Sequence, residues 1–191
     1  MVVDSDEINA YAGPGGWVFV TTGAIRAAKS EDELAGILAH EIAHVVRGHA
    51  LGNIKKSRYA DVGADVLQAA GTAALTPQQV EQLNGLMEGL IEDTMDAIFV
   101  KGYSRDTEYE ADKLSVEITI AAGYKPIGLV NFLETLQGKQ DTGKGGMFAT
   151  HPKASDRLAR VTKQIAGKKL ADDTVPAERV ERFKAKTKSL H

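Results

Sequence analysis

Hydrophobic and polar positions follow a β-type pattern only near the N-terminus and a helical pattern afterwards. Two short apolar runs, 8–12 and 17–22, flank a cluster of glycine and proline residues. That arrangement is typical of a β-hairpin or of two neighbouring strands. Beyond residue 22 the apolar positions recur at intervals of three and four, which predicts helices. We therefore expect an α+β chain that is mainly helical, with a small N-terminal sheet.

The best-defined helix start lies at Ser30. Ser30 followed by Glu33 forms a capping box, and Glu31 and Asp32 add negative charge to the first turn, where the helix dipole favours it. The predicted helix runs to about His49. Its apolar side chains lie near one face: Leu34, Ile37, Leu38 and Val45.

Serine, proline and glycine divide the remaining chain into further helices. We expect helices over about 51–74, 76–102, 104–123, 126–137, 153–166 and 176–188, with a glycine-containing loop over 138–150. The stripe of apolar residues between 80 and 98 indicates helix packing rather than a cofactor site. No repeat or long linker divides the chain. We therefore predict one domain over 1–191, with a C-terminal helical tail from about 168.

Composition narrows the classes of function. The chain has 191 residues, of which 43% are hydrophobic and 26% charged, and a formal net charge of −3. This charge offers no electrostatic basis for nucleic-acid binding. The lysines and arginines after residue 163 alternate with acidic residues, which indicates a solvated helix face. Because there is no cysteine, disulfides and thiolate metal ligands are excluded.

We expect neither a signal peptide nor a membrane span in this chain. Met1 is followed at once by Val-Val-Asp-Ser-Asp-Glu, which is not the pattern of a signal peptide. The longest uncharged run, 8–25, is interrupted by Gly13-Pro14-Gly15-Gly16. A second run, 66–80, is too short to span a bilayer and contains Pro77.

The clearest chemical signal is His40-Glu41-Ile42-Ala43-His44 on the capped helix. Residues four apart on a helix lie about 40° apart around its axis and about 6 Å apart along it. Two imidazoles at this spacing can bind one tetrahedral zinc ion from a single face, and Glu41 can reach a water at the metal without being a ligand. The motif predicts one Zn²⁺ per chain, bound by His40 and His44, with Glu41 as general base.

A catalytic zinc ion needs a third protein ligand. The longer pattern with a third histidine is absent, because Arg47 and Ala50 stand where its glycine and histidine would be. His49 is half a turn out of phase with His40, so we expect it to have a surface or packing role.

Glu108 and Asp112 share a face of a later predicted helix. By spacing, Glu108 could be a ligand and Asp112 could accept the N–H of a ligand histidine, or both could simply be solvated. Glu110 points to the opposite side, where we expect a surface ion pair.

Several motifs in order resemble one family. The HExxH motif is followed by Ser104-Arg105-Asp106-Thr107-Glu108-Tyr109-Glu110-Ala111-Asp112, and then by His151-Pro152 with Arg157 five residues past the proline. Asn9-Ala10-Tyr11 precedes Pro14-Gly15-Gly16 and Val18-Phe19-Val20-Thr21-Thr22-Gly23. This set, over roughly 4–161, is similar to the gluzincin metallopeptidase family of CAAX prenyl protease, HtpX and BepA, metallopeptidase family forty-eight.

The resemblance implies a zincin-like catalytic domain and a set of roles. His40, His44 and Glu108 would be zinc ligands, with Glu41 as base and Asp112 as the partner of a ligand histidine. His151 would lie in the cleft, and Arg157 would contact substrate. Since the prenyl proteases and HtpX have membrane helices and this chain has none, it resembles the soluble branch, which implies a periplasmic or cell-envelope location. Membrane-associated partners of a full-length protein are also implied.

Two further expectations concern the cleft. If the strand 17–22 is the sheet edge bordering it, an extended substrate could add to Trp17, Val18, Phe19 and Val20 by main-chain hydrogen bonds, which would favour unfolded polypeptides. His151 could donate to the oxyanion of the reaction, occupy the open metal position as a latch, or cap the helix that follows.

The sequence thus predicts a zinc metalloendopeptidase that acts on unfolded or misassembled proteins. One alternative is a zinc-stabilised, chaperone-like or binding module with vestigial or latent catalysis. Glu41 argues against it, because a purely structural site has no use for that carboxylate. Another is a helical scaffold without metal, which elemental analysis would detect.

Overall fold

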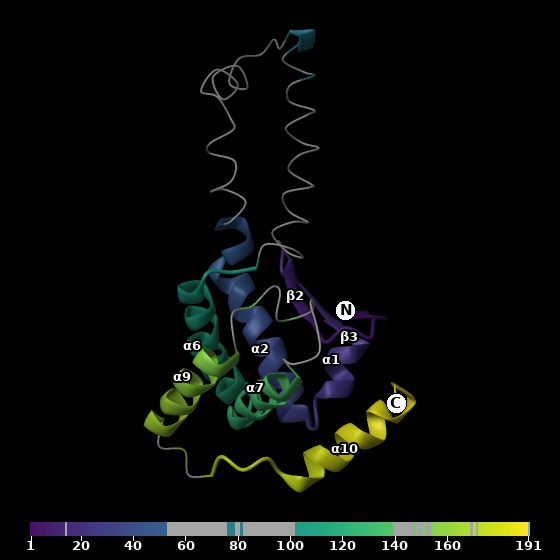
Figure 1. The fold of residues 1–191 in the computed structure, drawn as a ribbon, viewed down its shortest axis with the longest axis vertical. Helices are drawn as coiled ribbons and strands as arrows, with labels where there is room; N and C mark the ends of the chain where they lie inside the picture. The colour runs from purple at the N-terminus through teal and green to yellow at the C-terminus, as the bar shows by residue number, and fades with distance from the viewer. Residues whose placement is uncertain are drawn as a thin grey trace.

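The structure, a computed structural model, describes residues 1–13, 15–52, 76–78, 81, 102–139, 147, 151, 154–168, 170 and 172–190. Within these residues a small sheet lies beside a group of helices, so the chain is α+β and mainly helical (Figure 1). The predicted fold class is confirmed. The predicted helices over 51–74 and 76–102, the apolar stripe between 80 and 98, and the loop over 138–150 lie mostly outside the described residues.

The sheet has three strands in the order β1-β3-β2. Strands β2 (Ala10–Gly13) and β3 (Trp17–Thr21) form the predicted antiparallel hairpin, with Tyr11 opposite Phe19. Strand β1 (Val2–Val3) pairs in parallel with the end of β3. The sequence carries no signal for β1, because two exposed valines are too short a run to show a period.

Two helices follow the sheet. Helix α1 (Thr22–Ala27) begins directly after β3, where the Thr21 hydroxyl accepts from the Ala24 N–H. Helix α2 (Glu31–Arg47) begins after Ser30, whose hydroxyl accepts from the Glu33 N–H, as the capping box predicts. It ends at Gly48, whose φ of 65° lies in the left-handed region that favours glycine.

The later helices agree with the predicted boundaries to within a few residues. They are α6 (Arg105–Ala121), α7 (Ile127–Lys139), α9 (Ala154–Gly167) and α10 (Ala177–Thr187), and the 3₁₀ turn η2 (Lys188–Leu190) follows. No helix in the described part of the chain is long and apolar enough to cross a membrane.

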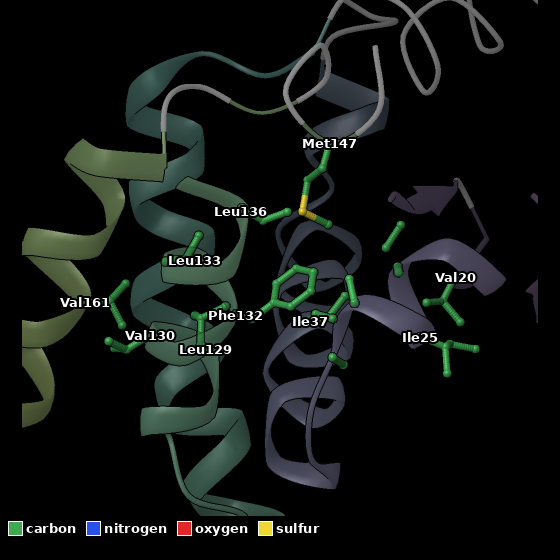
Figure 2. Close-up of a cluster of buried hydrophobic side chains, with 14 of the residues drawn as sticks. Val20, Ile25, Ile37, Leu129, Val130, Phe132, Leu133, Leu136, Met147 and Val161 are labelled. Carbon is green, nitrogen blue, oxygen red and sulfur yellow. The ribbon is translucent and has the colours of Figure 1, made fainter. Parts of the chain in front are cut away.

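Helix α2 occupies the centre and contacts α6, α7 and the sheet. It crosses α7 very closely at two glycines. A Cβ atom on Gly36 would lie 2.9 Å from the Leu129 Cα, and one on Gly128 would overlap the Asp32 carbonyl oxygen. Buried side chains between the sheet, α2, α7 and α9 form the core, among them Ile37, Phe132 and Leu133 (Figure 2). This packing fixes the position of α2 and of the side chains it presents to α6.

Candidate metal centre

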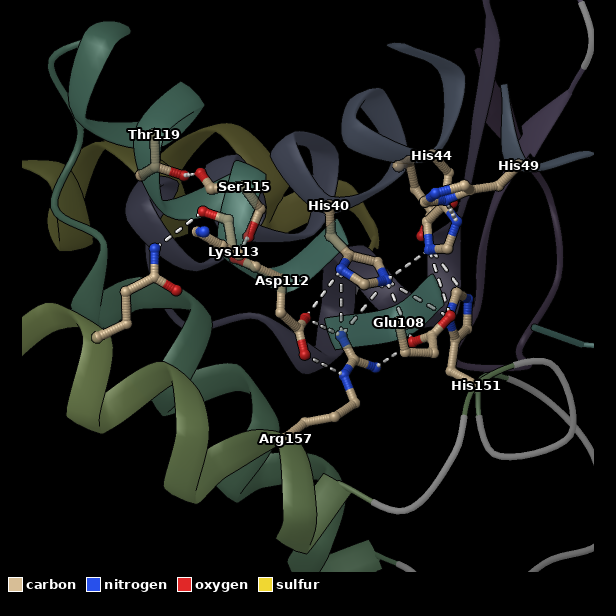
Figure 3. A network of polar contacts seen from close by, with 12 residues as sticks. His40, His44, His49, Glu108, Asp112, Lys113, Ser115, Thr119, His151 and Arg157 are labelled. Atoms are coloured by element: carbon tan, nitrogen blue, oxygen red, sulfur yellow. Dashed lines mark hydrogen bonds and ion pairs between the residues drawn. The ribbon is translucent and has the colours of Figure 1, made fainter. Parts of the chain in front are cut away.

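Helices α2 and α6 bring together the three ligands that the sequence and the resemblance indicate. The Nε2 atom of His40 lies 3.5 Å from Glu108 Oε2, and that of His44 lies 3.3 Å from Glu108 Oε1. The two Nε2 atoms are 3.0 Å apart. All three side chains are buried. The four-residue spacing of His40 and His44 on α2 turns both rings toward Glu108 on α6 (Figure 3).

His151 joins this cluster from a distant part of the chain. Its Nδ1 atom lies 2.8 Å from Glu108 Oε1 and 3.4 Å from His40 Nε2. One donor atom from each of His40, His44, Glu108 and His151 falls within 4.8 Å of the others. The ring therefore reaches the position where a fourth ligand would bind. The capping role left open for His151 does not account for this placement.

The buried carboxylates indicate that the cluster fits a cation. Glu41 is 1% exposed, and neither of its oxygens has a hydrogen-bond partner among the described residues, although His151 Nε2 lies 3.8 Å from Oε1. Such orphaned acceptors are rare in a folded protein unless an ion or water completes them. Two imidazole nitrogens, a carboxylate oxygen and a further imidazole are a donor set that suits zinc. The residues present thus fit a metal ion.

His40 is held from behind by a carboxylate. Its Nδ1 atom lies 3.0 Å from Asp112 Oδ1. Arg157 donates to both oxygens of Asp112, from Nε at 2.9 Å and from Nη2 at 2.7 Å. Arg157 is 3% exposed and the structure gives it a role inside the protein; the expected contact with substrate stays a prediction. Its guanidinium is used inside the protein, where it fixes Asp112 and offsets the buried negative charge.

His44 has different neighbours. Its Nδ1 atom lies 2.9 Å from His49 Nδ1, and His49 Nε2 lies 3.5 Å from Glu110 Oε2. The other Glu110 oxygen accepts from Arg47 Nε at 3.0 Å, the surface ion pair that the helix phase of Glu110 predicts. The ring of Tyr103 stacks on His44, with 4.1 Å between centroids and 22° between planes.

Sequence reasoning misses His49 and Tyr103. Helical phase excludes His49 from the site, but α2 ends at Gly48, so that phase no longer applies to the next residue. A glycine in the C-cap position was the available signal. Tyr103 directly precedes the Ser104 cap of α6, and nothing in its local pattern distinguishes it.

The neighbours of each histidine set its pKa. Burial and the Arg157 charge act to lower the pKa of His40, but Asp112 and Glu108 outweigh them and raise it to about 9. Burial lowers the pKa of His44 to about 3 despite Glu108 nearby. His44 is therefore neutral at pH 7 and ready to bind a metal, whereas His40 must release a proton first.

The expected substrate strand is also corrected. Trp17, Val18, Phe19 and Val20 belong to β3, which lies between β1 and β2 and is not the sheet edge. The edge strand beside α2 is β2, where Ala12 and Gly13 line a small cavity together with His44 and Val45. The Thr21 N–H donates to the Asn9 carbonyl, and Tyr11 with Phe19 is the next pair of the same kind, so the backbone N–H and C=O of Ala12 are directed away from β3.

A helix that presents two histidines and a glutamate to a carboxylate on a second helix defines the class of HExxH metallopeptidases. The sequence matches peptidase family M48 over residues 1–165. The chain belongs to this family of hydrolases, and the predicted resemblance is confirmed.

Three relatives illustrate the range of similarity. The chain is 33% identical over 165 residues to metalloprotease YcaL of Escherichia coli (strain K12), which covers 86% of this chain and 61% of the relative. It is 27% identical over 160 residues to the beta-barrel assembly-enhancing protease of the same strain, covering 83% and 32%. It is 34% identical over 159 residues to mitochondrial metalloendopeptidase OMA1 of Schizosaccharomyces pombe, covering 80% and 42%. The chain therefore spans less than two thirds of the length of each.

Proposed function

We propose that residues 1–191 act as one catalytic domain, a zinc metalloendopeptidase that cleaves unfolded or misassembled polypeptides. The observation that carries the proposal is the convergence of His40, His44 and Glu108 on one point, beside the buried carboxylate of Glu41, which accepts no hydrogen bond from the described residues. Family membership and the names of the relatives support the same conclusion. Neither favours the chaperone-like or binding module.

In this proposal His40, His44 and Glu108 hold one zinc ion. The ion would supply a Lewis acid that polarises the scissile carbonyl and makes water easier to deprotonate. Glu41 accepts the proton of the attacking water and passes it to the leaving amine. Burial raises the pKa of Glu41, which strengthens it as a base. Asp112, held by Arg157, fixes the His40 ring so that Nε2 faces the site.

His151 would regulate access to this site. Its Nδ1 atom lies 2.8 Å from Glu108 Oε1 and 3.4 Å from His40 Nε2. These distances suit a fourth metal ligand better than a side chain that lies outside the metal site. We propose that it acts as a latch, which closes the site until the ring moves away.

Substrate would lie along β2 rather than β3. Ala12 can offer both a donor and an acceptor to an extended chain, which would add as a further strand. Such binding recognises the backbone of the substrate through main-chain hydrogen bonds and so favours unfolded segments. Since some relatives are named for enhancing β-barrel assembly, we propose a periplasmic, cell-envelope location for this chain, with membrane-associated partners.

The direct test combines metal analysis with proteolysis. Purified protein should contain about one equivalent of zinc per chain, the number of sites that the cluster offers. It should cleave casein, lose this activity after treatment with a chelator, and regain the activity when zinc is added back. Cleavage that survives complete metal removal, or a protein that binds no zinc, would contradict the proposal.

A further inference from the structure

The two histidines of the HExxH motif have unlike partners at their outer nitrogens. Both turn Nε2 toward Glu108. Behind His40 the partner is a carboxylate, Asp112, at 3.0 Å; behind His44 it is a second imidazole, His49, at 2.9 Å. Ligand histidines usually donate their other N–H to an acceptor that fixes the ring, so His49 stands where such an acceptor belongs.

The positions of the protons follow from this geometry. A neutral His44 that uses Nε2 toward a metal carries its proton on Nδ1. It must then donate to His49 Nδ1, which has to be unprotonated. The proton of a neutral His49 is therefore on Nε2, the atom that lies 3.5 Å from Glu110 Oε2. Arg47 completes the series at the surface by donating to Glu110.

Exposure supports an ordered path from the inside to the surface. The side chain of His44 is 0% exposed, that of His49 10%, and those of Glu110 and Arg47 both 48%. The only negative charge in this series, on Glu110, is thus near solvent and is paired with Arg47.

A neutral acceptor has a physical advantage at this position. The carboxylate behind His40 is balanced by Arg157, which is bound to it. Among the described residues, no arginine or lysine contacts His44. A carboxylate in place of His49 would therefore add an unbalanced negative charge beside Glu108 and Glu41. The imidazole accepts the His44 N–H without that charge.

We infer that His49 is a positioning residue of the metal centre: its Nδ1 accepts the His44 N–H and holds His44 in the tautomer that binds metal through Nε2, while Glu110 sets the tautomer of His49. This inference rests on the proposed zinc site. It adds to that site a relay, by which we mean the series of contacts from His44 through His49 and Glu110 to Arg47 at the surface.

The test is the zinc affinity of the full chain, measured by competition with a chelator of known affinity. In His49→Phe an aromatic ring remains but the acceptor is lost, and zinc affinity should fall about tenfold to a hundredfold. In His49→Asn the amide oxygen stands near the place of Nδ1, so affinity should stay within about threefold of wild type. Glu110→Gln should weaken binding by less than about tenfold, because the acceptor itself remains.

Controls separate this relay from general effects. Glu117 lies two turns beyond Glu110 on α6, is also 48% exposed and pairs with Lys168, so Glu117→Gln is the matched surface change and should leave zinc affinity unaltered. Thermal melting of the metal-free variants checks that each is folded. If His49→Phe does not fold, His49→Gln replaces it, since that amide oxygen lies near Nε2 and leaves the His44 N–H without an acceptor.

The outcomes distinguish this inference from the proposed function. Loss of affinity in His49→Phe with retention in His49→Asn supports the relay. Equal loss in both variants would mean that an acceptor in the place of Nδ1 does not restore the site, and wild-type affinity in His49→Phe would mean that the acceptor has no role at the metal; either overturns the inference and leaves the zinc site intact. A wild-type chain that binds no zinc overturns both.

Discussion

At the scale of single residues, the site is a balance of buried charges. Burial by itself raises the pKa values of Glu108 and Asp112, but the nearby charges of Arg157 and, for Glu108, His151 outweigh it and hold both below their usual range. For Glu41 burial prevails and the pKa is raised. Two ionised carboxylates thus face one guanidinium and the protonated ring of His40, and a divalent cation would supply the compensating charge once His40 releases its proton.

The first prediction concerns Glu41. Glu41→Gln should keep zinc and lose cleavage, because the amide has nearly the same shape as the carboxylate but cannot accept a proton. Zinc content and casein cleavage of the same preparation measure both effects. Activity above a few per cent of wild type would contradict the assignment of Glu41 as the base.

The second prediction compares the two carboxylates of α6. Glu108→Ala should lose both zinc and activity. Asp112→Asn should weaken zinc binding about tenfold to a hundredfold through His40. Because Asp112→Asn also leaves Arg157 without its main ion-pair partner, it should reduce the free energy of unfolding by about 3–5 kcal/mol.

Chelator competition and urea unfolding measure these effects. Glu110→Ala serves as the comparison on the same helix: it should weaken zinc far less than Glu108→Ala. If Glu110→Ala removed the metal while Glu108→Ala did not, the assignment of the ligand would be wrong.

The third prediction concerns His151. If its ring closes the site, His151→Ala should cleave an unfolded substrate faster than wild type, with zinc still bound by the other three ligands. The ratio of kcat to KM for a fluorescent peptide measures this. Slower turnover with unchanged peptide affinity would instead show that His151 stabilises the transition state, and unchanged kinetics would exclude both roles.

At the scale of elements, helix ends and strand order decide which groups face the site. The left-handed Gly48 ends α2 and lets His49 turn back toward His44. The addition of β1 to β3 makes β3 the central strand and leaves β2 as the edge beside α2. An edge strand tolerates a missing N–H, whereas a central strand loses a ladder hydrogen bond.

The fourth prediction uses this difference. Ala12→Pro removes a donor that points away from β3, so it should impair cleavage of a long unfolded substrate while zinc content and folding persist. Phe19→Pro removes a donor that pairs with Tyr11 inside the sheet, so it should destabilise the fold itself. Circular dichroism melting and casein cleavage separate the two. Unaltered turnover in Ala12→Pro would mean that substrate binds elsewhere.

At the scale of the whole molecule, the C-terminal helix belongs to the fold although the family match ends at residue 165. Helix α10 runs along the base of the helices (Figure 1). Phe183 is 5% exposed within the core, and Arg179 donates to Asp32 next to the start of α2 at 2.6 Å. Arg182 pairs with Glu31 in the same turn. The predicted helical tail is therefore attached to the helix that carries the HExxH motif.

The fifth prediction tests this attachment. Phe183→Ala should lower the free energy of unfolding by about 3–5 kcal/mol, since it leaves a cavity in the core. Phe183→Leu, which keeps most of the apolar volume, should cost much less. Urea unfolding measures both. A loss below about 1 kcal/mol in Phe183→Ala would mean that α10 contributes little to the fold.

Features that depend on neighbours within a turn or two of helix can be predicted from the amino-acid sequence. The Ser30 cap, the phase of His40, Glu41 and His44, and the shared face of Glu108 and Asp112 all follow from local spacing, because helix geometry is set by residues three and four apart. The mainly helical fold class follows for the same reason. Family resemblance added the pairing of Glu108 with the two histidines.

Features that join distant segments become visible when the helices and strands are packed together. The order of the strands depends on the pairing of β1. Arg157 is buried because it meets Asp112, which lies 45 positions earlier in the chain. The partner of His44 depends on how the chain leaves α2 at Gly48. His151 likewise reaches Glu108 from 43 positions away. Long-range packing and charge pairing fix these contacts, and no local periodicity records them, because the residues involved meet only after the helices have packed.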